Sequence, residues 1–167
     1  MAIHYVKGNL LEADVDYICH QVNCQGKMGS GIAKSIREKW PIVYEEYLER
    51  YQWFVERAAE FSQFEDGITP SEIMLGTCNF TKVNDKQTVV NLAAQEYYGY
   101  DGKQYTSYDA FWFCLNVLKI ELPKGSRIGF PDHIGCCRGG ANWEIIRTMI
   151  DKALGKDYEV YIYKLED

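Results

Sequence analysis

The stretch that most constrains the fold is Tyr17–Trp40, in which an apolar segment runs into glycines and then into residues at helical spacing. Residues 17–22 are mostly apolar, as expected of a strand that is covered on both faces of a sheet. Ser30 can cap a helix whose apolar positions are Ile32, Ala33, Ile36 and Trp40. A strand, a glycine loop and a helix N-terminus bring backbone N–H groups and a positive dipole end to one point. This arrangement favours a phosphate.

The spacing of these glycines leaves two interpretations open. GKMGSG differs from the G-x-G-x-x-G of dinucleotide folds, and it is not a Walker A loop because Lys27 precedes the second glycine. Residues 23–31, the first glycine loop, form either a phosphate-binding loop or an ordinary structural turn. His20 and Asn23 favour the first interpretation, because the ends of strands in α/β sheets usually present ligand-binding groups.

A second strand, glycine loop and helix follow later in the chain. Arg127–Pro131 reads as a strand, and residues 132–142, the second glycine loop, contain Gly135, Gly139 and Gly140 before an apolar helix face that begins at Trp143. Two glycine loops that meet helix N-termini in one small α/β domain indicate a ligand with two phosphates.

The remaining segments alternate between strand and helix patterns, which predicts the α/β class. Val55–Ser71 is left open between a short helix and an irregular insertion. The other expected elements are a strand over 3–6, a helix over 41–54, strands Ile73–Phe80 and Thr88–Ala94 joined by a hairpin turn at 83–86, a helix Tyr108–Glu121 and a last strand Asp157–Lys164.

Length and composition predict one domain over residues 1–167. A chain of 167 residues with 47% hydrophobic content can bury a single core, and its net charge of −6 disfavours a broad grip on duplex nucleic acid. The N-terminus lacks a signal-peptide pattern, and no apolar run is long enough to span a membrane. The six cysteines include no C-x-x-C pair, so we expect reduced thiols in the cytoplasm. Cys24 and Cys136 are read as small space-filling residues rather than reactive ones.

The loop that follows the strand Thr88–Ala94 is rich in tyrosine and also has two interpretations. In the first, Tyr97, Tyr98 and Tyr105 pack the loop onto the domain, because exposed aromatic residues cost solubility. Alternatively the loop is a flap over a ligand, with Glu96 and Asp101 as its carboxylates.

Four segments together resemble the macro domain family over nearly the whole chain: Gly8-Asn9-Leu10, HQVNCQGKMGSGIAKSI, VVNLAAQ and IGCCRGGANW. The chain is most similar to the branch with the DarG-type antitoxins, the ADP-ribosyl-glutamate hydrolases and the yeast-type ADP-ribose 1″-phosphate phosphatase. The resemblance implies a three-layer α/β/α fold with a central mixed sheet and a cleft for ADP-ribose, with no cofactor or metal.

The resemblance also implies site residues. Asn9 would lie near the adenine, where many relatives have an aspartate, and His20 matches a histidine that looks catalytic in the phosphatase-like relatives. Hydrolysis needs a base that titrates near neutral pH, for which His20 is the first candidate and His133 the second, with Asp101 as the orienting carboxylate. The alternative for His20 is a structural histidine at a strand end whose hydrogen bonds are satisfied by the backbone. The expected ligand-binding residues are Asn9, Leu10, Asn23, Gly26, Met28, Gly29, Gly31, Ile32, Leu92, Ile134, Gly135, Cys136, Cys137, Arg138, Gly139, Gly140 and Ala141.

Two departures from the family pattern keep a second function open. Where the glutamate-hydrolase branch has a lysine after the asparagine strand, this chain has Ala94, Gln95 and Glu96. An aspartate found inside the second glycine loop of some relatives falls at Gly139. The sequence therefore predicts a hydrolase acting at C1″ of the distal ribose, on ADP-ribose 1″-phosphate or an ADP-ribosyl ester, with a non-catalytic ADP-ribose reader as the alternative. We expect a monomer. Binding of RNA ends or another nucleotide is disfavoured by the acidic charge.

Overall fold

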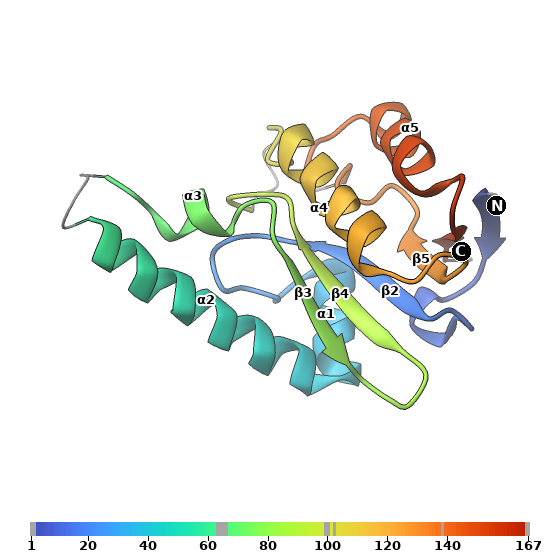
Figure 1. Ribbon diagram of the computed structural model, residues 1–167, viewed down its shortest axis with the longest axis horizontal. Helices are drawn as coiled ribbons and strands as arrows, with labels where there is room; N and C mark the ends of the chain where they lie inside the picture. The colour runs from blue at the N-terminus through green and yellow to red at the C-terminus, as the bar shows by residue number, and fades with distance from the viewer. Residues whose placement is uncertain (1–2, 63–66, 99–100, 102, 138, 166–167) are drawn as a thin grey trace.

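One mixed sheet of six strands forms the centre of the molecule, in the order β1-β6-β5-β2-β4-β3 (Figure 1). The computed structural model describes residues 3–62, 67–98, 101, 103–137 and 139–165. The strands are β1 (Ile3–Lys7), β2 (Tyr17–Val22), β3 (Cys78–Lys82), β4 (Thr88–Ala93), β5 (Arg127–Pro131) and β6 (Glu159–Lys164). The helices are η1 (Leu10–Glu12), α1 (Gly31–Lys39), α2 (Pro41–Phe61), α3 (Pro70–Met74), α4 (Tyr108–Glu121) and α5 (Trp143–Leu154).

Five of the strands run parallel, and only β3 is antiparallel to its neighbour within the described residues. The central strands are apolar on both faces, as in β4, where Val89, Val90 and Leu92 are all fully buried. Such continuous apolar runs are typical of parallel strands that are covered by helices on both sides. The carboxyl ends of the parallel strands therefore lie together at one edge of the sheet.

Helices cover both faces of the sheet. Figure 1 shows α2 on one side of the strands, with α4 and α5 on the other. Tyr47 and Ile36 belong to the core formed by α1, α2 and η1, and Phe111 and Leu115 belong to the core formed by α4 and α5. The predicted three-layer α/β/α fold with a mixed sheet is confirmed.

In the region 55–71, which the sequence left open, the described residues include the end of α2 and the start of α3. The helix that begins at Pro41 continues to Phe61, beyond the predicted end at residue 54. The predicted strand Ile73–Phe80 is wrong in its first half, because α3 occupies Pro70–Met74 and β3 begins at Cys78. A capping box between Thr69 and Glu72 begins α3. It stabilises a helix at Ile73 despite the β propensity of that residue.

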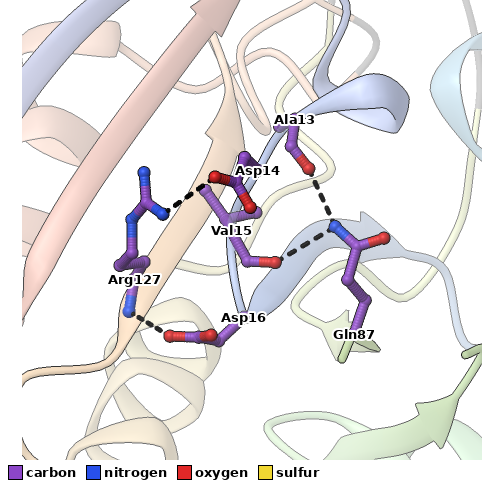
Figure 2. A network of polar contacts seen from close by, with 6 residues as sticks. All are labelled: Ala13, Asp14, Val15, Asp16, Gln87 and Arg127. Atoms are coloured by element: carbon purple, nitrogen blue, oxygen red, sulfur yellow. Dashed lines mark hydrogen bonds and ion pairs between the residues drawn. The ribbon is translucent and has the colours of Figure 1, made fainter. Parts of the chain in front are cut away.

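A polar network holds the segment between η1 and β2 (Figure 2). The Gln87 side chain donates to the carbonyl oxygens of Ala13 and Val15 at 2.8 and 3.1 Å. The Asp16 carboxylate accepts from the backbone N–H of Arg127 at 2.8 Å, and the Arg127 guanidinium pairs with Asp14 at 3.2 Å. These contacts fix the chain at the amino ends of β2, β4 and β5.

Among the helices of the described residues, none has the length and apolar content that crossing a bilayer requires.

Replacing Gln87 by Met should lower the free energy of unfolding by about 1–2 kcal/mol, because two backbone carbonyls lose their donor while side-chain volume is kept. Urea denaturation measures the change. The matched control is Gln52→Met on the exposed side of α2, which should leave the midpoint unchanged. Equal midpoints for wild type and Q87M would contradict the role given to Gln87.

Candidate functional site

A cleft of about 1260 Å³ crosses the carboxyl ends of the parallel strands. Its walls come from the ends of β1, β6, β5 and β2 and from Gln95, which follows β4. Neighbouring strands lie about 4.8 Å apart, so a cleft across five strand ends is about 19 Å long. This edge is where open α/β sheets bind their ligands. The geometry fits an elongated molecule rather than a compact one.

The first glycine loop is held by the side chain of Asn23. Its Oδ1 accepts from the backbone N–H of Gln25 at 2.9 Å, and its Nδ2 donates to the carbonyl oxygen of Lys27 at 3.0 Å. The Tyr47 hydroxyl of α2 lies 2.7 Å from the carbonyl oxygen of Asn23 and 2.9 Å from its Oδ1. Asn23 lines the cleft, but most of its hydrogen-bonding capacity shapes the loop.

Gly26 and Gly29 have different roles in this loop. Gly26 has a φ of 73°, and a Cβ there would lie 2.9 Å from the Tyr51 ring, so the position needs glycine. A Cβ at Gly29 would meet no described atom within 4 Å. Gly29 lines the cleft whereas Gly26 does not. Only the second of these two glycines keeps space open for a ligand.

The N-terminus of α1 opens into the cleft without a side-chain cap. Ser30 is the N-cap residue, but its side chain makes no capping hydrogen bond. Asn9, Thr69, Ser107 and Asn142 do cap the helices that follow them. Ser30, Gly31, Ile32 and Ala33 all line the cleft. The first turn of α1 therefore presents backbone N–H groups and the positive dipole end to whatever occupies the cleft.

The second glycine loop forms the facing wall. Ile134, Gly135, Cys137 and Gly139 line the same cleft as the first loop. The helix that follows differs from α1, because Asn142 caps the N-terminus of α5 with its own side chain, accepting from Glu144 at 2.9 Å. Of the two loops, only the first leads into a helix end that is free of a side-chain cap.

Gly139 has no room for a side chain. A Cβ there would overlap the Thr106 hydroxyl and the carbonyl oxygen of Gly135. An aspartate, which some relatives carry at the matching position, cannot be accommodated in this loop as it is folded.

The structure places most of the predicted ligand-binding residues on the cleft wall. Those that line it are Asn9, Leu10, Asn23, Met28, Gly29, Gly31, Ile32, Ile134, Gly135, Cys137 and Gly139. Gly26, Leu92, Cys136, Gly140 and Ala141 are close in sequence to the wall but do not line it. Arg138 lies outside the described residues.

His20 is fully buried and does not line the cleft. The side chain is fully buried in β2, and its Nε2 donates to the Oδ1 of Asn91 at 2.5 Å. Its Nδ1 is buried without a partner among the described residues. Burial lowers the pKa of His20 from 6.5 to about 4, and the hydrogen bond to Asn91 offsets only part of this effect. The imidazole is therefore neutral near pH 7.

Asp101 is exposed on the tyrosine-rich loop, whereas His20 is fully buried and bonded to Asn91. Its carboxylate accepts from the Tyr105 hydroxyl at 2.9 and 3.0 Å. Neither Asp101 nor His20 lines the cleft. The structure thus does not bring the two predicted catalytic residues together.

The described part of the tyrosine-rich loop combines the two interpretations given above. The backbone N–H of Tyr105 joins the loop to Gly139, whereas Tyr98 lines the cleft and remains about half exposed, at 52%. The Glu96 carbonyl oxygen accepts from the backbone N–H of Cys24 and from the Gln25 side chain, both at 3.1 Å. The start of this loop is therefore fastened to the first glycine loop.

Several cleft residues were not predicted. Gln21 and Gln95 line the cleft and join through a 2.7 Å hydrogen bond from Gln21 Nε2 to Gln95 Oε1. Gln21 could have been found from its place near the end of a buried strand, beside Asn23. Gln95 follows β4, and only the strand order shows that β4 lies next to β2 in the sheet.

The charged side chains of the described cleft wall are mostly cationic. Lys27, Arg37 and Lys164 line it together with Asp132. This local balance is opposite in sign to the net charge of −6 of the chain. A ligand with negative charge suits such a wall.

His133 also lines the cleft, next to Asp132. Its Nδ1 lies 2.8 Å from the Asp132 carboxylate, and its ring stacks on Trp143 with centroids 5.0 Å apart. His133 has a φ of 58°, a conformation that non-glycine residues seldom adopt. The carboxylate and the indole together hold the imidazole in a single orientation.

The two loop cysteines that the sequence raised are poor nucleophiles. Desolvation raises the pKa of Cys24 and of Cys136 from 9.0 to about 12 in each case. Within the described residues, no group of three or more histidine, cysteine or acidic side chains is placed to hold a metal ion.

Comparison with known proteins gives one curated relative and several solved structures. No family model matches the chain. The chain is 38% identical over 164 residues to a DNA ADP-ribosyl glycohydrolase of Thermus aquaticus, covering 97% of this chain and 41% of that protein. It therefore spans about two fifths of the relative's length.

Two of the solved structures that share the fold belong to bacterial DarG or DarTG proteins. The macrodomain of Thermus aquaticus DarG superposes with a TM-score of 0.72 at 20% identity, covering 96% of this chain and 97% of that one. Thermosipho africanus DarTG in complex with ADP-ribose superposes with a TM-score of 0.73 at 17% identity, covering 98% of this chain and 41% of that one.

The buried His20 predicts a loss of stability in acid. The folded pKa is about 4 and the ordinary value 6.5, so the unfolded chain takes up a proton first as the pH falls through 6.5. Stability is unaffected by this group above pH 6.5 and falls progressively towards pH 4, by about 3 kcal/mol in all. His20→Gln should remove this part of the pH dependence in urea titrations between pH 7 and 4. Parallel curves for the two proteins would show that His20 does not titrate in this way.

The two glycines of the first loop should respond differently to alanine. Gly26→Ala should cost about 1–3 kcal/mol of unfolding free energy, because the new methyl group meets the Tyr51 ring in an unfavourable backbone conformation. Gly29→Ala should change it by less than about 0.5 kcal/mol. Thermal and urea denaturation of the pair test this, and equal destabilisation by both would refute the assignment.

Proposed function

The chain belongs to the macro domain family, and from this premise we propose that its cleft binds ADP-ribose. The observation that supports this most directly is the uncapped N-terminus of α1 facing the second glycine loop across one cleft. Backbone N–H groups at a helix start hold phosphates without a basic patch, which suits a chain of net charge −6. The ADP-ribose in the Thermosipho africanus complex, a protein of the same fold, is further support.

The two ends of the cleft differ in polarity, and this difference orients the ligand. At the β1 and β6 end the wall includes Leu10, Leu11 and Tyr163, which offer apolar surface to a flat adenine ring. At the β2 and β4 end it includes the amides of Gln21 and Gln95, which make this end the more polar one and the better match for the distal ribose. The diphosphate would then lie between the two glycine loops, in the middle of the cleft.

We propose that the chain is a hydrolase acting at C1″ of the distal ribose. The substrates would be ADP-ribose 1″-phosphate, as for a phosphatase, or ADP-ribosyl esters. The name of the Thermus aquaticus relative adds ADP-ribosylated DNA as a third class. We further propose that the chain acts in the cytoplasm, because its six cysteines are free thiols, and that it acts as a monomer.

A non-catalytic reader is the second candidate, and specific observations favour it. His20 is fully buried and bonded to Asn91, so the predicted catalytic pair of His20 and Asp101 would have to move to reach a ligand. The amide of Gln95 is occupied on both sides, accepting from Gln21 and donating to the carbonyl oxygen of Tyr97 at 2.7 Å. In the reader these groups would serve only to shape the cleft.

Gly29→Asp should weaken ADP-ribose binding by about tenfold or more, because it places a carboxylate at the mouth of the α1 N-terminus, where the diphosphate would lie. Isothermal titration calorimetry measures the dissociation constant. Gln52→Glu on α2 adds the same charge away from the cleft and should leave binding unchanged. An absence of heat with wild-type protein would end the ADP-ribose proposal.

The hydrolase and the reader are separated by turnover. Wild-type protein should release product from at least one of ADP-ribose 1″-phosphate, O-acetyl-ADP-ribose, ADP-ribosylated protein and ADP-ribosylated DNA, whereas Gly29→Asp should lose this activity together with binding. Chromatography of the released ADP-ribose or phosphate gives the rate. Tight binding with no turnover on the whole panel would establish the reader.

A further inference from the structure

The hydroxyl group of Thr106 joins three walls of the cleft, although Thr106 itself does not line it. The side chain is only 2% exposed. Gln21 of β2 donates to the Thr106 Oγ1 at 2.8 Å, and the Thr106 Oγ1 lies 2.8 Å from the carbonyl oxygen of Gly135 in the second glycine loop. Gln21 also donates to Gln95 at 2.7 Å. The strand end, the tyrosine-rich loop and the second glycine loop therefore meet at this one side chain.

The direction of these hydrogen bonds is fixed by the available protons. The Gln21 amide nitrogen has two, and they point to Gln95 and Thr106. The single proton of the Thr106 hydroxyl is then free to be donated to the Gly135 carbonyl oxygen. Because the Thr106 hydroxyl is itself buried, its loss would leave the Gln21 donor and the Gly135 acceptor without this partner.

The backbone at residue 106 holds the same loop at a second point. The N–H groups of Tyr105 and Thr106 donate to the carbonyl oxygen of Gly139 at 2.7 and 2.9 Å. The hydroxyl also fills the space next to Gly139, where a Cβ would overlap it. Both cleft-lining glycines of the second loop are thus positioned against Thr106.

The first glycine loop has separate supports. Asn23 and Tyr47 hold it through contacts that do not include Thr106. A change at Thr106 should therefore affect one wall of the cleft and leave the facing wall, including the α1 N-terminus, as it is.

We propose that Thr106 is a positioning residue for the diphosphate: without touching the ligand, its hydroxyl sets the shape of the second glycine loop and thereby the affinity of the cleft. The inference rests on the proposed binding of ADP-ribose. A misplacement of binding groups by about 1 Å is enough to lower the performance of a site severely.

The test compares Thr106→Val, which keeps the shape of the side chain and removes the hydroxyl, with Thr106→Ser, which keeps the hydroxyl. T106V should weaken ADP-ribose binding about tenfold in calorimetry, and T106S should bind within about twofold of wild type. The matched control is Thr81→Val in β3, because Thr81 is also buried, at 1% exposure, and donates to Glu46. T81V should lower the melting temperature without changing the affinity.

A second readout needs no ligand. In ¹⁵N–¹H spectra of the free proteins, T106V should shift the amide signals of Gly135 and Gly139 and leave those of Gly29 and Gly31 in place. If T106V does not fold, Thr106→Ala is measured in the same way. Unshifted Gly135 and Gly139 signals, wild-type affinity in T106V, or equal loss of affinity in T106V and T81V would each overturn the proposal.

Failure of the proposed function is distinguishable from failure of this inference. Wild-type protein that does not bind ADP-ribose refutes the former, and the ligand-free spectra still decide whether Thr106 shapes the second glycine loop.

Discussion

The site depends first on the parallel alignment of the strands. Because β1, β6, β5, β2 and β4 run in one direction, the loops that follow them all emerge at one edge of the sheet. The contacts of Asp16, Gln87 and Arg127 at the opposite edge hold β2 level with its two neighbours (Figure 2). The cleft thus exists because strands that are far apart in sequence end at the same edge of the sheet. The glycine loops then supply the backbone groups that can bind a ligand at this edge.

Much of the fold follows from local patterns, and the failures have a local cause as well. The helix Tyr108–Glu121 and the strand Arg127–Pro131 were predicted with their observed bounds, because apolar spacing and end signals agree there. The predicted strand that begins at Ile73 is wrong in its first half, because a short apolar run has no clear periodicity. The capping box that precedes it stabilises a helix there instead. Leu92 is buried and Gln95 lines the cleft because of the way β4 pairs with its neighbours. The spacing of residues in the sequence does not determine this pairing.

The candidate site divides in the same way. The glycines and apolar residues of both loops were predicted on the basis of motif and resemblance, and most of them line the cleft. His20 shows the limit of that reasoning, because a polar residue near a strand end can face either the edge or the interior of the sheet. In this chain its register opposite Asn91 gives it a partner inside the sheet. Nothing in the sequence pointed to Thr106 as a residue that supports the cleft.

The contact between α2 and the first glycine loop bears on how such a cleft changes over time. Tyr44 and Tyr47 reach from the helix to the backbone of Gly26 and Asn23, and Tyr51 packs where Gly26 leaves no space for a methyl group. The loop is therefore rigid before any ligand arrives, and association spends little conformational entropy on ordering it. Moving the loop sequence into another protein would not transfer its shape, because the tyrosine side chains of α2 also determine that shape. Loop and helix are expected to diverge as a unit.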